Sequence, residues 1–438
     1  MNSARPRGEL LRLLGLGFAV AVAVGEMIGS GILRTPSLVA QQVGIAAAIL
    51  ALWVFGAVHA ALQANVLAEL GTALPRVGGQ YVFVRRAMGD IAGLIVGWTM
   101  WCAHIAGMAA SAIAFADFTV PLIPAAAGHE TGIAVGVQLV LYGANIAGLR
   151  EGRAVQGATT LLKAAMLISF AVAAILFMPA HTGAPPSPAT AAGSLGLAAA
   201  YQLIRGAYNG WHAPVYFTEE SLAPARSLPR ALFLGIAFTA AIYVLVNAAL
   251  LHALGPAEIA TRALPFTIVL NRIAGHGASV LFAIGALITV ASCANANVMI
   301  APRILFALSR DRLLPSALMA VNKGGSPYAG FALTALLSIA LSMTGGFRML
   351  FGMIATLVTL ASILTEFSLF VLRRREPELA RPYRAVLYPW LPGAAIILDV
   401  ILLALFARAD LRGAAFAAML CLLCVPFAIV ARRAWAAP

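Results

Sequence analysis

The sequence predicts an all-α polytopic membrane protein with twelve transmembrane helices. Of the 438 residues, 62% are hydrophobic and only 10% are charged, and the mean hydropathy is +0.93. A soluble domain of this length could not bury so much apolar surface. The apolar residues also fall into successive runs of about 20 residues, the length that an α-helix needs to cross a bilayer.

Counting these runs along the chain gives the twelve spans. Their expected limits are 11–39, 44–70, 90–118, 131–148, 156–179, 194–218, 230–254, 276–307, 327–345, 349–372, 387–407 and 412–431. The connections are short, so residues 1–438 are expected to form a single transmembrane domain. No Walker A sequence is present, which argues against ATP hydrolysis as an energy source.

The basic residues predict the orientation of the chain. Most of them fall in one alternate set of connections. The other set holds only Arg262, Arg272, Arg348, Arg408 and Arg412. Because cytoplasmic loops are enriched in Lys and Arg, both termini are expected in the cytoplasm, and the net charge of +13 is read as a topology signal and not as a nucleic-acid footprint.

Two of the spans are interrupted at mid-depth by helix-breaking and polar residues. The first contains Gly25-Glu-Met-Ile-Gly-Ser-Gly-Ile32, and the sixth contains Gly206-Ala-Tyr-Asn-Gly-Trp-His-Ala-Pro214. Irregular backbone at membrane depth is tolerated only where it is buried in protein or lines a cavity. Such small residues also occur where transmembrane helices simply pack closely, and this alternative stays open.

The two breaks occupy corresponding positions if the chain consists of two five-span repeats and two extra helices. The repeats would cover about 11–179 and 194–372, and the extra helices about 387–431. Paired interruptions at matching positions are the best sequence indication of a mid-membrane binding site in secondary transporters.

Segments beside both breaks resemble the amino acid–polyamine–organocation (APC) superfamily, and most closely its L-type amino acid transporter-like bacterial permeases. Gly29-Ser-Gly-Ile32 is similar to the family's GSGIF motif, with Leu33 in the final position. Segments 69–89, 145–153, 208–231, 301–315 and 373–384 resemble further family motifs, so the likeness covers nearly the whole chain.

The resemblance implies a LeuT-type fold, with two inverted repeats and with helices one and six unwound. It also implies alternating access and amino-acid substrates. At the first break, the amides of Ser30, Gly31 and Ile32 would receive the substrate carboxylate at a half-helix N-terminus. Carbonyls freed near Glu26, Ile28, Ala207 and Tyr208 would receive the ammonium group. Asn209, Gly210 and Trp211 complete the predicted second half of the site, and Tyr208 and Trp211 are also candidates for gating.

Lys163 is the only lysine inside a predicted span. A lysine at this place in the family stands where sodium-coupled relatives hold a sodium ion, so the resemblance implies sodium-independent transport. An ammonium group within a membrane is costly unless it is paired or neutral, so Lys163 could also carry a coupling proton. The alternative is that Lys163 lies near the cytoplasmic end and extends its amino group to the surface.

Two residues depart from the family. Glu26 is acidic where relatives are usually not, and Asn209 replaces the Asp or Gly of many relatives. Glu26 is expected to pair with Lys163, to carry a proton, or to accept a cationic substrate side chain, because an unpaired carboxylate at this depth would be too costly.

Polar residues of spans three and eight are candidates for the side-chain pocket, although such residues often only bridge helices. These candidates are His104, Met108, Ser111, Ser292, Asn295 and Asn297. Glu366 and Asp399 are further acids within spans, but no sequence pattern connects them to the breaks.

The sequence therefore predicts a sodium-independent transporter of neutral L-amino acids in a bacterial inner membrane, working as a proton symporter or an exchanger. A cationic amino acid or polyamine exchanger and a non-transporting amino-acid sensor are the alternatives. No cofactor, metal or enzymatic residue set is predicted. The partners are an amino acid, the lipid bilayer and, in the symport case, protons; the sequence does not distinguish a monomer from a homodimer.

Overall fold

The computed structural model describes residues 15–76, 78–146, 152–181, 193–322, 327–344, 346–427 and 429. Several residues used to predict the topology lie outside these ranges. They are Arg5, Arg7, Arg12, Arg150, Lys323, Arg432 and Arg433. The predicted span limits at residues 11, 148, 345 and 431 also lie outside them.

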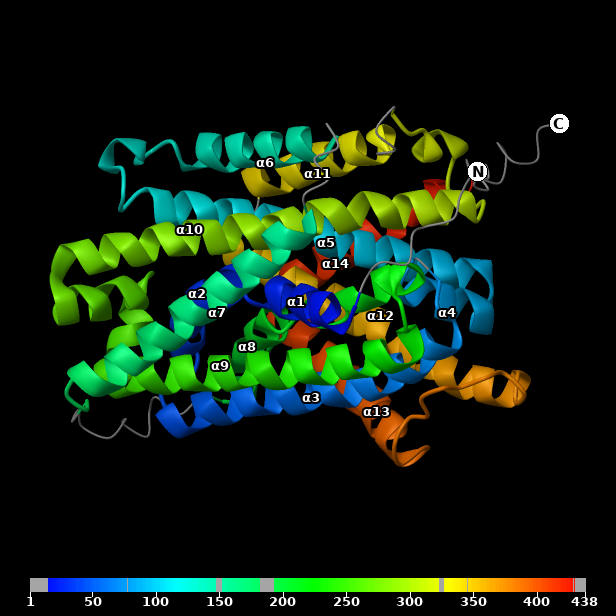
Figure 1. Ribbon diagram of the computed structural model, residues 1–438, viewed down its shortest axis with the longest axis horizontal. Coiled ribbons are helices and arrows are strands. Elements are labelled where there is room, and N and C mark those ends of the chain that lie inside the picture. The colour runs from blue at the N-terminus through cyan, green and yellow to red at the C-terminus, as the bar shows by residue number, and fades with distance from the viewer. Residues whose placement is uncertain are drawn as a thin grey trace, which may run out of the picture.

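The described chain folds into a bundle of long helices that run roughly along one axis (Figure 1). In order, they are α1 (Leu16–Met27), α2 (Ser30–Ala40), α3 (Ala46–Ala73), α4 (Gln80–Met88), α5 (Asp90–Thr119), α6 (Glu130–Ile146), α7 (Gly152–Phe177), α8 (Ser194–Ala207), α9 (Pro224–Thr261), α10 (Pro265–Arg310), α11 (Tyr328–Thr344), α12 (Phe347–Arg375), α13 (Trp390–Ala409) and α14 (Leu411–Leu422). Short 3₁₀ segments are η1 (Pro124–Ala126), η3 (Ala213–Glu220) and η4 (Ser316–Met319).

Eight helical segments of the described chain are long and apolar enough to cross a membrane, counting α1 and α2 as one. The shorter apolar helices Tyr328–Thr344 and Leu411–Phe427 add to them. These lengths and compositions are those of a polytopic membrane protein.

Most helices begin and end within a few residues of their predicted limits, and α9 and α10 are the main differences. Both extend further, because a short helical segment follows a kink at Gly255 (φ 70°) in α9 and another precedes a kink at Gly275 (φ 76°) in α10. Both glycines have a positive φ, which residues with a Cβ atom rarely adopt. The helix α4 is not among the predicted spans, since it is short and lies in a connection.

Both predicted breaks are present. At the first, α1 ends at Met27 and α2 begins at Ser30, and Ile28 and Gly29 between them have non-helical backbone angles (Gly29 φ −149°, ψ −146°). At the second, α8 ends at Ala207 and η3 begins only at Ala213. Gly210, between these elements, has φ 114°, a conformation that favours glycine.

The broken helices lie in the interior of the bundle (Figure 1). The long helix α5 packs against α10 and α12, and α3 packs against α9. The pair α6 and α11 runs along one edge of the bundle (Figure 1). The half-helix α2 packs against α8, which brings the two breaks together.

Candidate functional site

The two helix breaks meet at one cavity. Backbone and side chains of both breaks line it, together with residues of α5, α10 and α12. The lining residues are Glu26, Met27, Gly29, Ser30, Gly31, Gly107, Ser111, Gly206, Ala207, Asn209, Cys293, Asn297, Phe351 and Ile354. Of the residues predicted to bind substrate, Glu26, Ser30, Gly31, Ala207 and Asn209 therefore lie at the cavity.

Glycine at position 31 allows the two half-helices to approach each other. A Cβ atom there would lie 2.8 Å from the Cα atom of Ala207 and 3.1 Å from the ring of Phe351. Beside it, the hydroxyls of Ser30 and Ser111 are 3.4 Å apart, which connects the start of α2 to α5. The N-terminus of α2 carries amides without intrahelical partners, as at any helix start, and these amides are directed toward the break.

Tyr243, on α9, joins the two breaks without lining the cavity. Its buried hydroxyl lies 2.6 Å from the carbonyl oxygen of Met27 and 3.0 Å from that of Ala207, and it can donate to either. The last residues of α1 and α8 thus share one hydrogen-bond donor. This residue is not among those predicted for the site, because a tyrosine within an apolar span carries no signal of its own.

Lys163, on α7, is fully buried and donates a hydrogen bond of 2.8 Å from Nζ to the carbonyl oxygen of Gly25. The alternative that this lysine extends to the membrane surface is therefore wrong. Its partner lies in the last turn of α1, where carbonyls lose their intrahelical donors as the helix ends. The ammonium group satisfies one of them, which is the favourable place for a cation on a helix dipole.

Glu26 is buried, and its side chain lies against the second break. A Cβ atom at Gly210 would lie 2.8 Å from Cγ of Glu26. Among the described residues, its ionisable neighbour is His104, whose Nδ1 is 3.6 Å from Oε1 of Glu26. Glu26 and Lys163 interact electrostatically, but no ion pair within 4 Å joins them among the described residues. Direct pairing, one of the three roles considered for Glu26, is therefore not observed.

His104 is oriented by Asn297. Its Nδ1 lies 2.9 Å from Oδ1 of Asn297, and since an amide oxygen only accepts, Nδ1 carries the hydrogen. Asn297 in turn donates from Nδ2 to the carbonyl oxygen of Cys293. These contacts link α5 to α10 and place two of the predicted pocket candidates beside Glu26.

Several buried polar atoms around the two breaks have no hydrogen-bond partner among the described residues. They are both carboxylate oxygens of Glu26, Nε2 of His104, Oδ1 of Asn209, Nε1 of Trp211, both ring nitrogens of His212 and the hydroxyl of Tyr216. Buried polar groups are nearly always paired, so such a group of unpaired atoms indicates a place for water or a polar ligand.

Similarity to known proteins shows the family of the chain. The amino acid permease family matches residues 14–428. The chain belongs to the amino acid permease family, within the APC superfamily. It is therefore a membrane transporter and not an enzyme.

Named relatives of the permease are amino-acid transporters or exchangers. The chain is 27% identical to the serine/threonine exchanger SteT of Bacillus subtilis, over 88% of this chain and 89% of the relative. It is 29% identical to the large neutral amino acids transporter small subunit 2 of Rattus norvegicus, over 87% and 74% of the two chains. It is 27% identical to the Asc-type amino acid transporter 1 of Mus musculus, also over 87% and 74%.

Other residues predicted for the site do not line the cavity of the permease. They are Ile28, Ile32, Tyr208, Gly210, Trp211, Met108, Ser292 and Asn295. Tyr208 points away from the cavity, because its hydroxyl donates to the carbonyl oxygen of Trp53 at 3.0 Å. Trp211 is buried against His212, with ring centroids 5.7 Å apart.

The expectation that Met108, Ser292 and Asn295 line the side-chain pocket is corrected. Met108 packs in an apolar cluster between α5, α6, α10 and α11. Ser292 donates to Oγ1 of Thr159 on α7 at 3.0 Å. The side chain of Asn295 accepts from Asn145 on α6 at 2.7 Å. The helical turn of α10 directs their neighbours Cys293 and Asn297 to the cavity instead.

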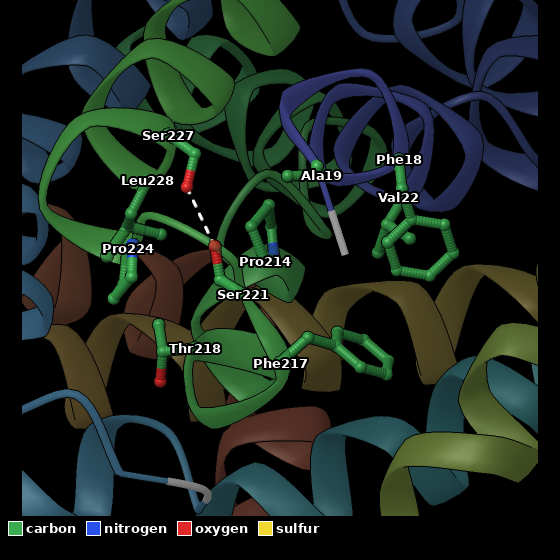
Figure 2. A pocket seen from close by; sticks show the side chains of 11 residues that line it. Phe18, Ala19, Val22, Pro214, Phe217, Thr218, Ser221, Pro224, Ser227 and Leu228 are labelled. Carbon is green, nitrogen blue, oxygen red and sulfur yellow. Dashed lines mark hydrogen bonds between the residues drawn. The ribbon is translucent and has the colours of Figure 1, made fainter. Parts of the chain in front are cut away.

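A second hollow lies between the first half of α1 and the segment after the second break. Figure 2 shows Phe18 and Val22 of α1 on one side of it, and Pro214, Phe217 and Pro224 on the other. Ser221 and Ser227, which also line it, are hydrogen-bonded to each other at 2.9 Å (Figure 2). This hollow is at the end of the bundle that carries the N-terminus of α1.

Polar contacts hold α2 at the opposite end of the permease. Arg34 pairs with Asp117 of α5. The hydroxyl of Ser37 donates to the carbonyl oxygen of Arg262 at 2.5 Å, and Nε2 of Gln41 donates to that of Ala260 at 3.0 Å. These contacts join α2, the second half of the first broken helix, to α5 and to the end of α9.

Proposed function

We propose that this permease is a sodium-independent secondary transporter of neutral L-amino acids that works by alternating access. The observation that carries the proposal is the meeting of two interrupted helices at one cavity, which residues of both breaks line. Broken helices at a midplane site are how secondary transporters bind charged ends of small substrates. A small amino acid presents one carboxylate and one ammonium group, and the cavity offers a partner for each.

The N-terminus of α2 is the proposed carboxylate site. The amides of Ser30, Gly31 and Ile32 are the first three of an eleven-residue helix, and the positive end of a helix dipole favours an anion. The ammonium group would bind near the carbonyl end of α1 and α8, around Glu26 and Ala207. The Tyr243 and Cys293 contacts to these carbonyls leave their second lone pairs available.

The position of the Lys163 ammonium group supports transport that does not depend on sodium. Its ammonium group already binds the carbonyl oxygen of Gly25, and a permanently placed organic cation at the end of α1 removes the need for a metal cation there. Proton symport and amino-acid exchange both remain compatible with this site, and the exchanger among the relatives favours exchange.

We further propose the complete topology predicted from the sequence. It has twelve spans, two inverted five-span repeats and two extra helices, with both termini on the cytoplasmic side of a bacterial inner membrane. The contacts of Arg34, Ser37 and Gln41 would then close the outer end of the substrate path. The hollow between α1 and η3 would lie on the path to the cytoplasm.

The test is uptake of radiolabelled amino acids into proteoliposomes that contain the purified permease. A panel of neutral, cationic and acidic amino acids is measured in sodium and in choline buffers, with and without internal substrate and with and without a pH gradient. We expect saturable uptake of small neutral amino acids at equal rates in both buffers. Uptake that requires sodium, or no uptake of any neutral amino acid, would contradict the proposal.

A cationic amino acid or polyamine exchanger is the second candidate, because the carboxylate of Glu26 lies at the cavity without a hydrogen-bond partner among the described residues. In that case Glu26→Gln abolishes uptake of cationic substrates and spares neutral ones. A non-transporting sensor, the remaining alternative, would show ligand-induced thermal stabilisation without any flux.

A further inference from the structure

A second group of buried polar residues lies on α3, α8, α12 and α13, apart from the substrate cavity. These four helices pack against one another. The group contains His59, Gln63, Tyr201, Arg205, Glu366 and Asp399, each at most 4% exposed. None of them lines the cavity between the two breaks, so the proposed substrate site does not account for their burial.

His59 and Asp399 are at the centre of this buried network. Nε2 of His59 lies 2.9 Å from Oδ1 of Asp399, and both side chains are fully buried. At this distance the ring nitrogen and the carboxylate oxygen can share a proton, which either of the two groups can carry. The second carboxylate oxygen of Asp399 accepts a hydrogen bond of 2.6 Å from Nε2 of Gln63. On its other side, Nδ1 of His59 lies 2.6 Å from the hydroxyl of Tyr201.

Glu366 and Arg205 complete the network. Glu366, on α12, interacts electrostatically with Asp399 and with Arg205. Arg205, on α8, also interacts with His59 and donates from Nη2 to Ser362 at 3.4 Å. The carboxyl group of Glu366 also lies within hydrogen-bonding reach of the side chains of Asp399 and Gln63. The other titratable side chains near this face of the network are Tyr208, directly after α8, and Tyr243, on α9, whose rings pack edge to face.

Counting charges shows that the network is balanced only when it holds one additional proton. Arg205 supplies one permanent positive charge, and the two carboxylates supply two negative charges if both are ionised. A net charge in the interior of a membrane protein is strongly unfavourable. With His59 neutral, a net charge of zero requires one more proton, placed on Glu366, on Asp399 or on the second nitrogen of His59.

The helix α8 connects this network to the substrate cavity. Tyr201 and Arg205 belong to the network, while Gly206 and Ala207 on the same helix line the cavity. Gln202 also ties α8 to α12 through a hydrogen bond of 3.0 Å to the carbonyl oxygen of Gly352. A change in the charge of the network therefore changes the electrostatic attraction between α8 and the helices α3, α12 and α13. Because α8 ends at the second break, such a change acts on the break as well.

We propose that the His59–Asp399–Glu366–Arg205 network is a proton-binding site, and that its proton is coupled to the position of α8 and hence to transport. The coupling to transport rests on the proposed function, whereas the proton site itself does not. The ligand is a single proton exchanged with solvent, with no other reactant.

The proton site is tested by infrared difference spectroscopy on the full-length permease in lipid nanodiscs during a pH titration. We expect a carboxylic-acid C=O band that disappears as the pH rises in the wild type. The band is lost in Glu366→Gln or Asp399→Asn, and its pH midpoint shifts in His59→Gln. The control Glu130→Gln removes a partly exposed carboxylate at the start of α6 and should leave the band unchanged. A titrating band that is the same in all three network variants would overturn the proton site.

Tyr201→Phe is the second variant, because Glu366→Gln could disturb folding. It removes only the hydroxyl beside Nδ1 of His59 and is expected to shift the midpoint of the same band. An unshifted midpoint in a folded Tyr201→Phe would count against the proton site.

The coupling is tested by measuring exchange of the transported amino acid in proteoliposomes at equal pH on both sides. We expect Glu366→Gln to retain exchange but to lose the pH dependence seen in the wild type. A pH profile that matches the wild type would overturn the coupling. If the wild type transports no amino acid, the proposed function fails, and the infrared titration still decides the proton site.

Discussion

The hydroxyl of Tyr243 donates a hydrogen bond of 2.6 Å to the main-chain carbonyl oxygen of Met27, the residue at which α1 ends. The same hydroxyl lies 3.0 Å from the carbonyl oxygen of Ala207, at the end of α8. One side chain of α9 thus lies within hydrogen-bonding distance of carbonyls at both helix breaks and can donate its proton to either of them. These carbonyls would otherwise be buried without donors, since a broken helix loses the amides that normally bind them.

Tyr243→Phe is expected to weaken the link between the two breaks. The substitution keeps the ring packing against Trp53 and Tyr208 and removes only the donor. Loss of one buried hydrogen bond costs about 1 kcal/mol, which corresponds to about a fivefold change in an equilibrium constant. We expect a rise in the KM for amino-acid uptake of about this size, with normal expression. Tyr142→Phe, which removes a hydroxyl bonded to Ser338 far from the breaks, serves as the control, and an equal effect of both variants would contradict this role for Tyr243.

Lys163→Met is expected to reduce uptake more strongly than Tyr243→Phe. Methionine fills similar space but leaves the carbonyl oxygen of Gly25 without its charged donor. Hydrogen bonds to charged groups contribute about 1.5–3 kcal/mol, so a loss of uptake on the order of tenfold or more is expected. Uptake is measured in sodium and in choline buffers. Undiminished uptake by the variant in both buffers would show that the lysine has no part in the transport cycle.

Gly31→Ala is expected to abolish uptake, because the added methyl group would push the two half-helices apart at the cavity. It would meet the Cα atom of Ala207 at 2.8 Å. This neighbour is backbone and cannot rotate away, and overpacking of this kind costs about 1–3 kcal/mol. Gly136→Ala on α6 is the matched control, since nothing lies within 4 Å of its added methyl group. Normal uptake by Gly31→Ala would show that the breaks are not held as closely as described.

The broken helices are predictable from the sequence because glycines and polar residues at mid-depth disrupt a transmembrane helix that has no water to pair its backbone. Glu26, Ser30, Gly31, Ala207 and Asn209 belong to the breaks themselves, so their positions in the chain determine that they lie at the cavity. The polar residues of α10 carry no such signal, since the sequence does not show which side of this helix faces the breaks. The side chains of Ser292 and Asn295 face α7 and α6, while Cys293 and Asn297 face the cavity.

Contacts between distant helices could not be predicted from the sequence. Tyr243 is one example, and the His59–Asp399 pair is another, since its two residues lie on helices near opposite ends of the chain and no local pattern connects them. Glu366 and Asp399 stand in the sequence only as isolated acids within apolar spans. Their partners on α3 and α8 become evident only when the helices are packed together, because helix packing decides which of several buried polar residues meet.

Glu69, at the end of α3, is expected to be the carboxylate on which the stability of the permease depends most. It is 1% exposed and accepts hydrogen bonds from Nε (2.9 Å) and Nη2 (2.5 Å) of Arg373. Arg381 lies 3.2 Å from it, and the main-chain amide of Ala385 donates to it at 2.6 Å. This one side chain joins α3 to α12 and to the segment before α13.

Glu69→Gln removes the negative charge that compensates the positive charges of Arg373 and Arg381. Breaking a buried ion pair by removing one partner costs about 3–5 kcal/mol, because the remaining charge is left uncompensated. We expect a large fall in the thermal unfolding midpoint of the detergent-solubilised permease and a low yield of folded protein. The control Glu376→Gln removes a more exposed carboxylate that pairs with Arg86, where ion pairs contribute about 0–1 kcal/mol. Equal midpoints for the two variants would show that the Glu69 contacts do not stabilise the fold.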